Sequence, residues 1–277
     1  MPQSDSPVRW SDRRSTDGSG WCVLYRPEPE VCSRCLGAQN GAMDAREGRA
    51  ELRGAVARRD AGGLVQLLIG QPLPDDGLQL IGDGLLGALR QEVPEAPRLA
   101  GECASALRVR GWEGDDELAD SLEARLGTAP IRLLKPLVVD LEELAMVLEG
   151  DPVYSGGRID LQTGEVWPNA ALEDFEDTAE NDWDIDGPER WIWVHSHGSR
   201  SGYRDMELFI SEIDDAEVAD RLRIAISGRG AFRRFKDTLS RWPDLMTRWF
   251  AFSEDRQRGR ARAWLADEGY LATSRDV

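Results

Sequence analysis

The chain has 277 residues, which allows two domains, and its 41% hydrophobic and 31% charged residues exclude wholesale disorder. No apolar run reaches the roughly 20 residues of a membrane span, and the first residues lack the pattern of a secretory signal. The net charge of −17 predicts that the chain as a whole repels nucleic acid and anionic lipid. Four cysteines do not make a disulfide framework at this length, so we expect a cytoplasmic protein.

Residues 1–42 are polar and show no hydrophobic period. We expect the folded unit to begin at Met43, with residues 1–42 as a disordered tail or an over-extended start site. The alternative is a small extension held by metal, because Cys22, Cys32 and Cys35 include one Cys-x-x-Cys pair. A closed zinc site usually needs two such pairs, so the signal for zinc is weak.

Residues 43–128 have the helical period and predict a helical domain. About five short helices joined by short connections favour a small bundle. Asp75-Asp76 and Asp115-Asp116 are expected to cap two of the helices. The apolar faces are Leu78, Ile81, Leu85 and Leu89, then Leu99, Cys103 and Leu107, then Leu118, Leu122 and Leu126.

Residues 129–277 mix both periods, so the fold class expected for the chain is α+β, with a helical N-terminal bundle before a small α+β domain. Residues 173–186 contain eight acids in fourteen positions and predict a solvated loop. The expected elements are a strand at 137–139, a helix at 141–147, a hairpin at 158–167, a strand at 191–195, and helices at 202–212, 215–226, 231–240 and 244–266.

The charge is divided unevenly along the chain. Residues 221–262 hold twelve basic and four acidic residues, a net charge of +8. The remainder carries 22 basic and 47 acidic residues, a net charge of −25. The acidic total therefore conceals a basic C-terminal segment.

Within that segment, Gly228, Arg229 and Gly230 precede a helix that carries Arg233, Arg234 and Lys236. The apolar face of this helix, Phe232, Phe235 and Leu239, is expected to turn inward. A helix start exposes unpaired N–H groups, and glycine lets a ligand approach the backbone. The pattern indicates a site for phosphate or another anion. The alternative is an ordinary helix corner, with Gly228 as the cap of the preceding helix and the arginines as a solvated face.

The last helix places Arg256, Arg258, Arg260 and Arg262 near aromatic residues. Arginines between aromatic rings suit RNA or single-stranded nucleic acid. The alternative, which the spacing favours, puts the aromatic rings in the core and the arginines on the solvated face. Gly259 within this run predicts either a break in the helix or close packing.

His195 and His197 share one face of the expected strand and form a candidate metal pair, with an exposed pair at a strand end as the alternative. Asp182 to Gly187 matches the first half of an EF-hand loop, but Trp193 stands where the bidentate Glu is needed. The chain has no P-loop, no nucleophile elbow and no zinc-protease motif. No catalytic residue and no cofactor are therefore predicted.

Three runs of sequence carry a resemblance to a bacterial family. They are Asp160-Leu161-Gln162-Thr163-Gly164-Glu165-Val166, then Tyr203-Arg204-Asp205-Met206-Glu207-Leu208-Phe209, then Gly228-Arg229-Gly230-Ala231-Phe232-Arg233-Arg234-Phe235-Lys236-Asp237-Thr238-Leu239. With Arg248-Trp249 and Ala263-Trp264-Leu265, the region 137–270 resembles uncharacterised protein family 0158. The resemblance implies that this region is one structural unit. It implies no catalytic residue.

Our leading hypothesis is a binding or regulatory protein that engages phosphate of nucleic acid, RNA more than DNA, through residues 228–236. The second is a protein-interaction adaptor, whose helical region is the partner surface and whose basic segment pairs with the acidic loop 173–186. The third is a metal-dependent hydrolase that uses His195 and His197. The sequence predicts no membrane partner and does not set the oligomeric state.

Overall fold

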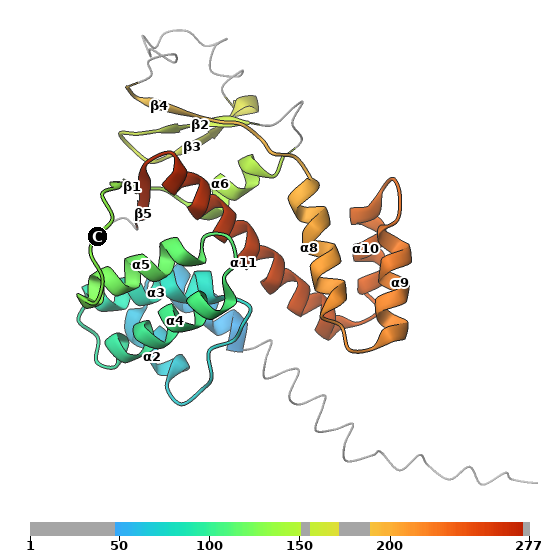
Figure 1. Ribbon diagram of the computed structural model, residues 1–277, viewed down its shortest axis with the longest axis horizontal. Helices are drawn as coiled ribbons and strands as arrows, with labels where there is room; N and C mark the ends of the chain where they lie inside the picture. The colour runs from blue at the N-terminus through green and yellow to red at the C-terminus, as the bar shows by residue number, and fades with distance from the viewer. Residues whose placement is uncertain (1–47, 151–155, 172–188, 274–277) are drawn as a thin grey trace, which may run out of the picture. The chain divides into compact units, whose positions relative to one another are not determined.

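The computed structural model describes residues 48–150, 156–171 and 189–273 (Figure 1). The chain has the α+β fold that the sequence predicts, mostly helical with two small sheets. The predicted tail 1–42, the acidic loop 173–186 and Cys22, Cys32 and Cys35 lie outside the described residues. In the described ranges, no helix is both long and apolar enough to cross a membrane.

Five helices form the first region, as the apolar period predicts. They are a helix at 48–57, α2 (Ala61–Leu68), α3 (Leu78–Arg90), α4 (Ala96–Arg110) and α5 (Asp115–Leu126). Their buried faces, including Leu85, Leu107 and Leu122, form a single hydrophobic cluster. Cys103 is a free thiol in this cluster, and burial raises its pKa to about 12, so it stays a neutral packing residue.

The predicted caps of two of these helices are wrong. α3 begins after Gly77, and α5 begins after Gly114, both in the left-handed conformation and without a side-chain cap. Asp115 is instead the first residue of α5 and is completely buried. Its carboxylate is held by Arg110 and Gln79, so it serves the core and not the helix end.

The next elements are one strand of a two-stranded sheet, a short helix and the three strands of an antiparallel sheet. They are β1 (Lys135–Val138), α6 (Leu141–Leu148), β2 (Gly157–Asp160), β3 (Val166–Pro168) and β4 (Trp191–Val194). β2 is the centre of an antiparallel sheet in the order β3-β2-β4, which confirms the predicted hairpin and the strand after it. Ile159 and Val194 face a hydrophobic cluster with α6 and the last helix.

The C-terminal part contains the four predicted helices and one strand that the sequence did not predict. The helices are α8 (Arg200–Ser211), α9 (Ala216–Ile226), α10 (Ala231–Leu239) and α11 (Pro243–Asp267), and the strand is β5 (Tyr270–Thr273). β5 pairs in parallel with β1, which precedes it by more than 130 residues. Phe209, Phe235, Trp249 and Phe252 form an aromatic core between these helices through edge and tilted ring contacts.

α11 is continuous through Gly259, so close packing is the correct alternative at this glycine. A Cβ on Gly259 would overlap the backbone oxygen of Glu113, and a Cβ on Gly114 would overlap the backbone of Gly259. The turn before α5 therefore lies directly on α11. Because α11 also contacts α3, α6, α8 and α10, it joins the helical region to the rest (Figure 1).

A buried polar network reinforces this junction. Asp255 on α11 accepts a hydrogen bond from the Gln79 backbone N–H at 2.8 Å and pairs with Arg110. Arg262, whose side chain is 1% exposed, donates to the Gln79 side chain at 2.9 Å and pairs with Asp83 at 2.6 Å. The predicted domain boundary near residue 128 stays a prediction, and these contacts cross it.

Candidate functional site

The turn between α9 and α10 contains the glycines that the sequence singles out. Gly228 and Gly230 have φ of 80° and 74°, the left-handed region that favours glycine. Gly230 is the N-cap of α10 and supplies no side chain to cap it. A Cβ on Gly228 would meet no atom within 4 Å, so this backbone is open to a ligand.

Arg234 folds back over this turn and shapes it. Its guanidinium donates to the carbonyl oxygens of Ala225 at 2.9 Å, Ser227 at 2.6 Å and Gly228 at 3.2 Å, and also to that of Arg229. One side chain thus satisfies the carbonyl groups at the end of α9 and in the turn. The sequence predicts Arg234 as an anion ligand, but its guanidinium N–H groups already donate to these carbonyl oxygens. Arg234 is therefore a positioning residue for the turn.

The N–H groups at the start of α10 remain available. The first hydrogen bond of the helix runs from the Arg234 N–H to the Gly230 oxygen at 3.2 Å, so the N–H groups of residues 231–233 precede it. The described structure places no capping side chain against them. These donors lie at the positive end of the α10 dipole, which favours an anion.

The basic side chains around this helix start are exposed. Arg233 has its nearest carboxylate, Asp237, at 3.7 Å, and both side chains are largely in solvent. Arg229 and Lys236 are exposed and form no ion pair with any described residue. We call Arg229, Arg233 and Lys236 the basic trio. Weak surface pairing of this kind leaves the trio free for an external anion.

The expected inward face of α10 is correct except at Phe232. Phe235 and Leu239 are buried as predicted, but Phe232 is 38% exposed. Its ring lies beside Gly202 of α8, where a Cβ would come within 3.1 Å of it. An aromatic ring is therefore partly exposed next to the basic trio.

The arginines of α11 do not face solvent, so both sequence interpretations need correction. Trp249 and Phe252 are core residues, as the second interpretation predicts, but Arg262 is buried and Arg256, Arg258 and Arg260 are only 11–14% exposed. The pairs are Arg256 and Arg260 with Asp205, Arg260 with Glu149, and Arg258 and Arg262 with Asp83. These four arginines of α11 are therefore neutralised internally, whereas Arg229, Arg233 and Lys236 present charge to solvent.

His195 and His197 follow the end of β4, and both are exposed. The His197 backbone N–H donates to the Leu148 oxygen at 2.8 Å, which fixes the chain there. Among the described residues, no group of three or more His, Cys, Asp or Glu side chains is arranged to hold a metal ion. The structure therefore adds no third ligand to the predicted pair.

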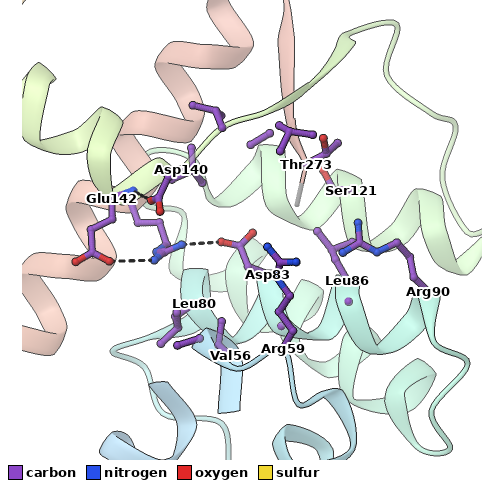
Figure 2. Close-up of a pocket in the computed structure, with 18 of the residues that line it drawn as sticks. Val56, Arg59, Leu80, Asp83, Leu86, Arg90, Ser121, Asp140, Glu142 and Thr273 are labelled. Atoms are coloured by element: carbon purple, nitrogen blue, oxygen red, sulfur yellow. Dashed lines mark hydrogen bonds and ion pairs between the residues drawn. The ribbon is translucent and has the colours of Figure 1, made fainter. Parts of the chain in front are cut away.

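A large cleft is the feature that the sequence did not indicate. It measures about 1680 Å³ and is lined by the helix 48–57, α3, α5, the start of α6 and β5. In Figure 2, Asp140 and Glu142 lie on one side of the cleft, and Arg59 and Arg90 lie on other sides of it. Glu143 and Glu165 also line it, and burial together with Asp140 and Glu165 raises the pKa of Glu143. The cleft thus has an acidic wall and basic side chains facing it.

Comparison with known proteins places the second half of the chain in a family. A UPF0158 protein of Pseudomonas aeruginosa is 25% identical over 145 residues, which is 51% of this chain and 90% of that protein. No solved structure matches the chain. The model of the uncharacterised protein family UPF0158 matches residues 135–276, about half of the chain, and the protein therefore belongs to that family.

Proposed function

We propose that the protein binds nucleic acid, RNA more than DNA, by holding phosphate at the turn between α9 and α10. The observation that carries the proposal is an uncapped helix start that no described carboxylate fills, with exposed Arg229 and Arg233 beside it and exposed Lys236 farther along α10, in its last turn. Amide donors, the positive end of the helix dipole, Arg229 and Arg233 are located at this start, and Lys236 extends the positive charge along α10. Arg234 supports this geometry from behind by holding the carbonyl groups of the turn.

The partly exposed ring of Phe232 favours single-stranded RNA over duplex DNA. A base that is not paired in a helix stacks on an aromatic side chain, while neighbouring basic residues hold the phosphates. The site is small, and the rest of the protein is strongly acidic. Binding should therefore involve about three phosphates, with a log–log salt slope of roughly −2.

The test is fluorescence anisotropy with a labelled ten-nucleotide single-stranded RNA and the full chain. Arg233→Glu with Lys236→Glu is expected to weaken binding by at least about tenfold and to flatten the salt dependence. The matched control is Arg221→Glu with Arg223→Glu. These arginines lie on α9 and form exposed pairs with Glu217 and Asp220, so the control changes the net charge equally.

Equal losses in the two double variants would show that only overall charge matters and would reject the site. RNA binding that is absent or independent of salt in the unaltered protein would reject the proposal altogether. Thermal unfolding of both variants confirms that neither substitution unfolds the domain, since all four positions are exposed.

The adaptor function is the second candidate, and the pairing of the α11 arginines favours it. A basic segment whose charge is already neutralised needs no nucleic acid to balance that charge. The neutralising carboxylates belong to α3, to α8 and to the C-cap of α6. Pairing with the acidic loop 173–186 falls outside the described residues. Under this function, association is expected to persist at high salt, whereas RNA binding is expected to weaken.

A further inference from the structure

The two-stranded sheet has edges with very different properties. β1 and β5 are parallel, with Lys135 opposite Tyr270 and Leu137 opposite Ala272. The Lys135 N–H donates to the Gly269 oxygen at 3.0 Å. Since alternate residues of a strand direct their backbone groups to opposite sides, the odd-numbered residues of β5 bond to β1. The N–H and C=O groups of Ala272 then point to the other edge.

The outer edge of β1 is closed to a further strand. Pro136 stands at an outward position and has no N–H to donate. Val138 holds the next outward position, and Gly164 of the β2–β3 turn lies against its carbonyl oxygen so closely that a Cβ would overlap it. A proline and a covering turn are two of the devices by which proteins protect a sheet edge.

Among the described residues, none protects the outer edge of β5 in this way. In the described structure, no residue forms a hydrogen bond with the outward groups of Ala272. Leu271, Ala272 and Thr273 line the large cleft, as do Ser121 and other residues of α5. Figure 2 labels Thr273 and Ser121 among the residues that line it. An unpaired strand edge therefore faces a cleft rather than open solvent.

The dimensions and charges of the cleft fit a peptide. At about 1680 Å³, the cleft exceeds the roughly 300–1,000 Å³ of a small-molecule pocket. Asp140, Glu143 and Glu165 supply its acidic wall, and exposed Arg58 and Arg59 supply basic side chains. Arg59 has φ of 55°, a strained conformation for a residue with a side chain. An extended segment with a basic residue at one end and an acidic residue at the other would match both the acidic wall and the two arginines.

We propose that an extended peptide of a partner protein adds to the β5 edge within this cleft as a third strand. Main-chain hydrogen bonds to Ala272 provide the common part of the recognition. The acidic wall and the arginines select the charged ends of the peptide and set its direction. The site is separate from the basic trio, so this proposal does not depend on nucleic-acid binding.

The test selects binders of the full chain from a displayed library of random ten-residue peptides and then N-methylates each binder at alternate residues. Only one of the two alternating sets of peptide amides can face β5. We expect N-methylation of that set to weaken binding about tenfold or more and of the other set to leave it nearly unchanged. We also expect bound peptide to slow hydrogen exchange at the Ala272 amide.

A variant gives a second measurement. Ala272→Pro removes the outward N–H while leaving the odd-numbered ladder with β1, and it is expected to weaken peptide binding about tenfold. The matched control is Ala272→Ser, which keeps the outward N–H at the same position and should leave peptide binding nearly unchanged. If the proline variant fails to fold, the N-methylated peptides and hydrogen exchange on the unaltered protein still test the proposal.

Three results would overturn the proposal. The first is a library that yields no binder, or binders equally tolerant of N-methylation in both sets. The second is a concentration-dependent dimer in sedimentation that protects the Ala272 amide, which assigns the edge to a second copy. The third is protection of that amide in the free protein that disappears when residues 1–42 are deleted, which assigns the cleft to the chain itself.

Discussion

Replacing Asp255 with alanine is expected to lower the free energy of unfolding by about 3–5 kcal/mol, because the buried Arg110 guanidinium loses one of its two carboxylate partners and the Gln79 backbone N–H loses its acceptor. The Asp255 side chain is 1% exposed and contacts both the Gln79 backbone N–H and Arg110. Burial raises the pKa of this carboxyl, and Arg110 opposes that shift. Urea unfolding followed by circular dichroism measures the change.

The matched control is Asp220→Ala, which removes an exposed carboxylate paired with Arg223 on α9. Surface pairs contribute little, so the loss there should stay within about 0.5 kcal/mol. A loss below about 1 kcal/mol for Asp255→Ala would mean that the polar network does not hold α11 to the helical region. The comparison therefore tests the junction and not only one ion pair.

Replacing Gly164 with alanine is expected to cost at least about 3 kcal/mol, for two reasons that add. The residue has φ of 75°, which an alanine adopts at a cost of about 1–2 kcal/mol. The new methyl group would also overlap the Val138 carbonyl oxygen, and neither backbone can yield without moving a strand. Thermal or urea unfolding of the variant gives the measured loss.

Gly228→Ala separates the two causes. Gly228 has φ of 80° but open space around its backbone, so only the conformational cost of about 1–2 kcal/mol applies. Similar losses at the two glycines would show that the β2–β3 turn does not pack on β1 as described. That result would also remove the cover that we assign to the outer edge of β1.

Local patterns in the sequence predicted most helices and the hairpin. Leu99, Cys103 and Leu107 recur at helical spacing, and all three are buried on one face of α4. The Thr163-Gly164 turn between two short apolar runs predicted the β2–β3 hairpin. Such signals come from neighbouring residues, so they need no knowledge of the rest of the chain.

Long-range contacts were not predictable in this way. β5 has four residues and follows a 25-residue helix, and it exists because β1 lies beside it. The burial of Arg262 depends on Gln79 and Asp83, which are distant in sequence. A run of arginines on a helix looks the same whether its partners are water, phosphate or carboxylates brought in by the fold.

The candidate site was predictable in part. Two glycines before a basic helix indicated an open helix start, and the structure has left-handed residues at both positions. The sequence did not reveal that Arg234 turns to the carbonyl groups behind the turn, while Arg229, Arg233 and Lys236 stay outside. Side-chain direction around a turn depends on which carbonyl groups lack partners, which only the three-dimensional structure shows.

The anion site is tested most directly by the backbone amide signals of the turn, observed by NMR during a titration of the full chain with inorganic phosphate. Binding at the start of α10 predicts saturable shifts concentrated at the amides of residues 228–233, and their loss when Arg233→Glu and Lys236→Glu are combined. Shifts that never saturate, that spread over the basic surface, or that survive in the double variant would contradict a phosphate site at this turn.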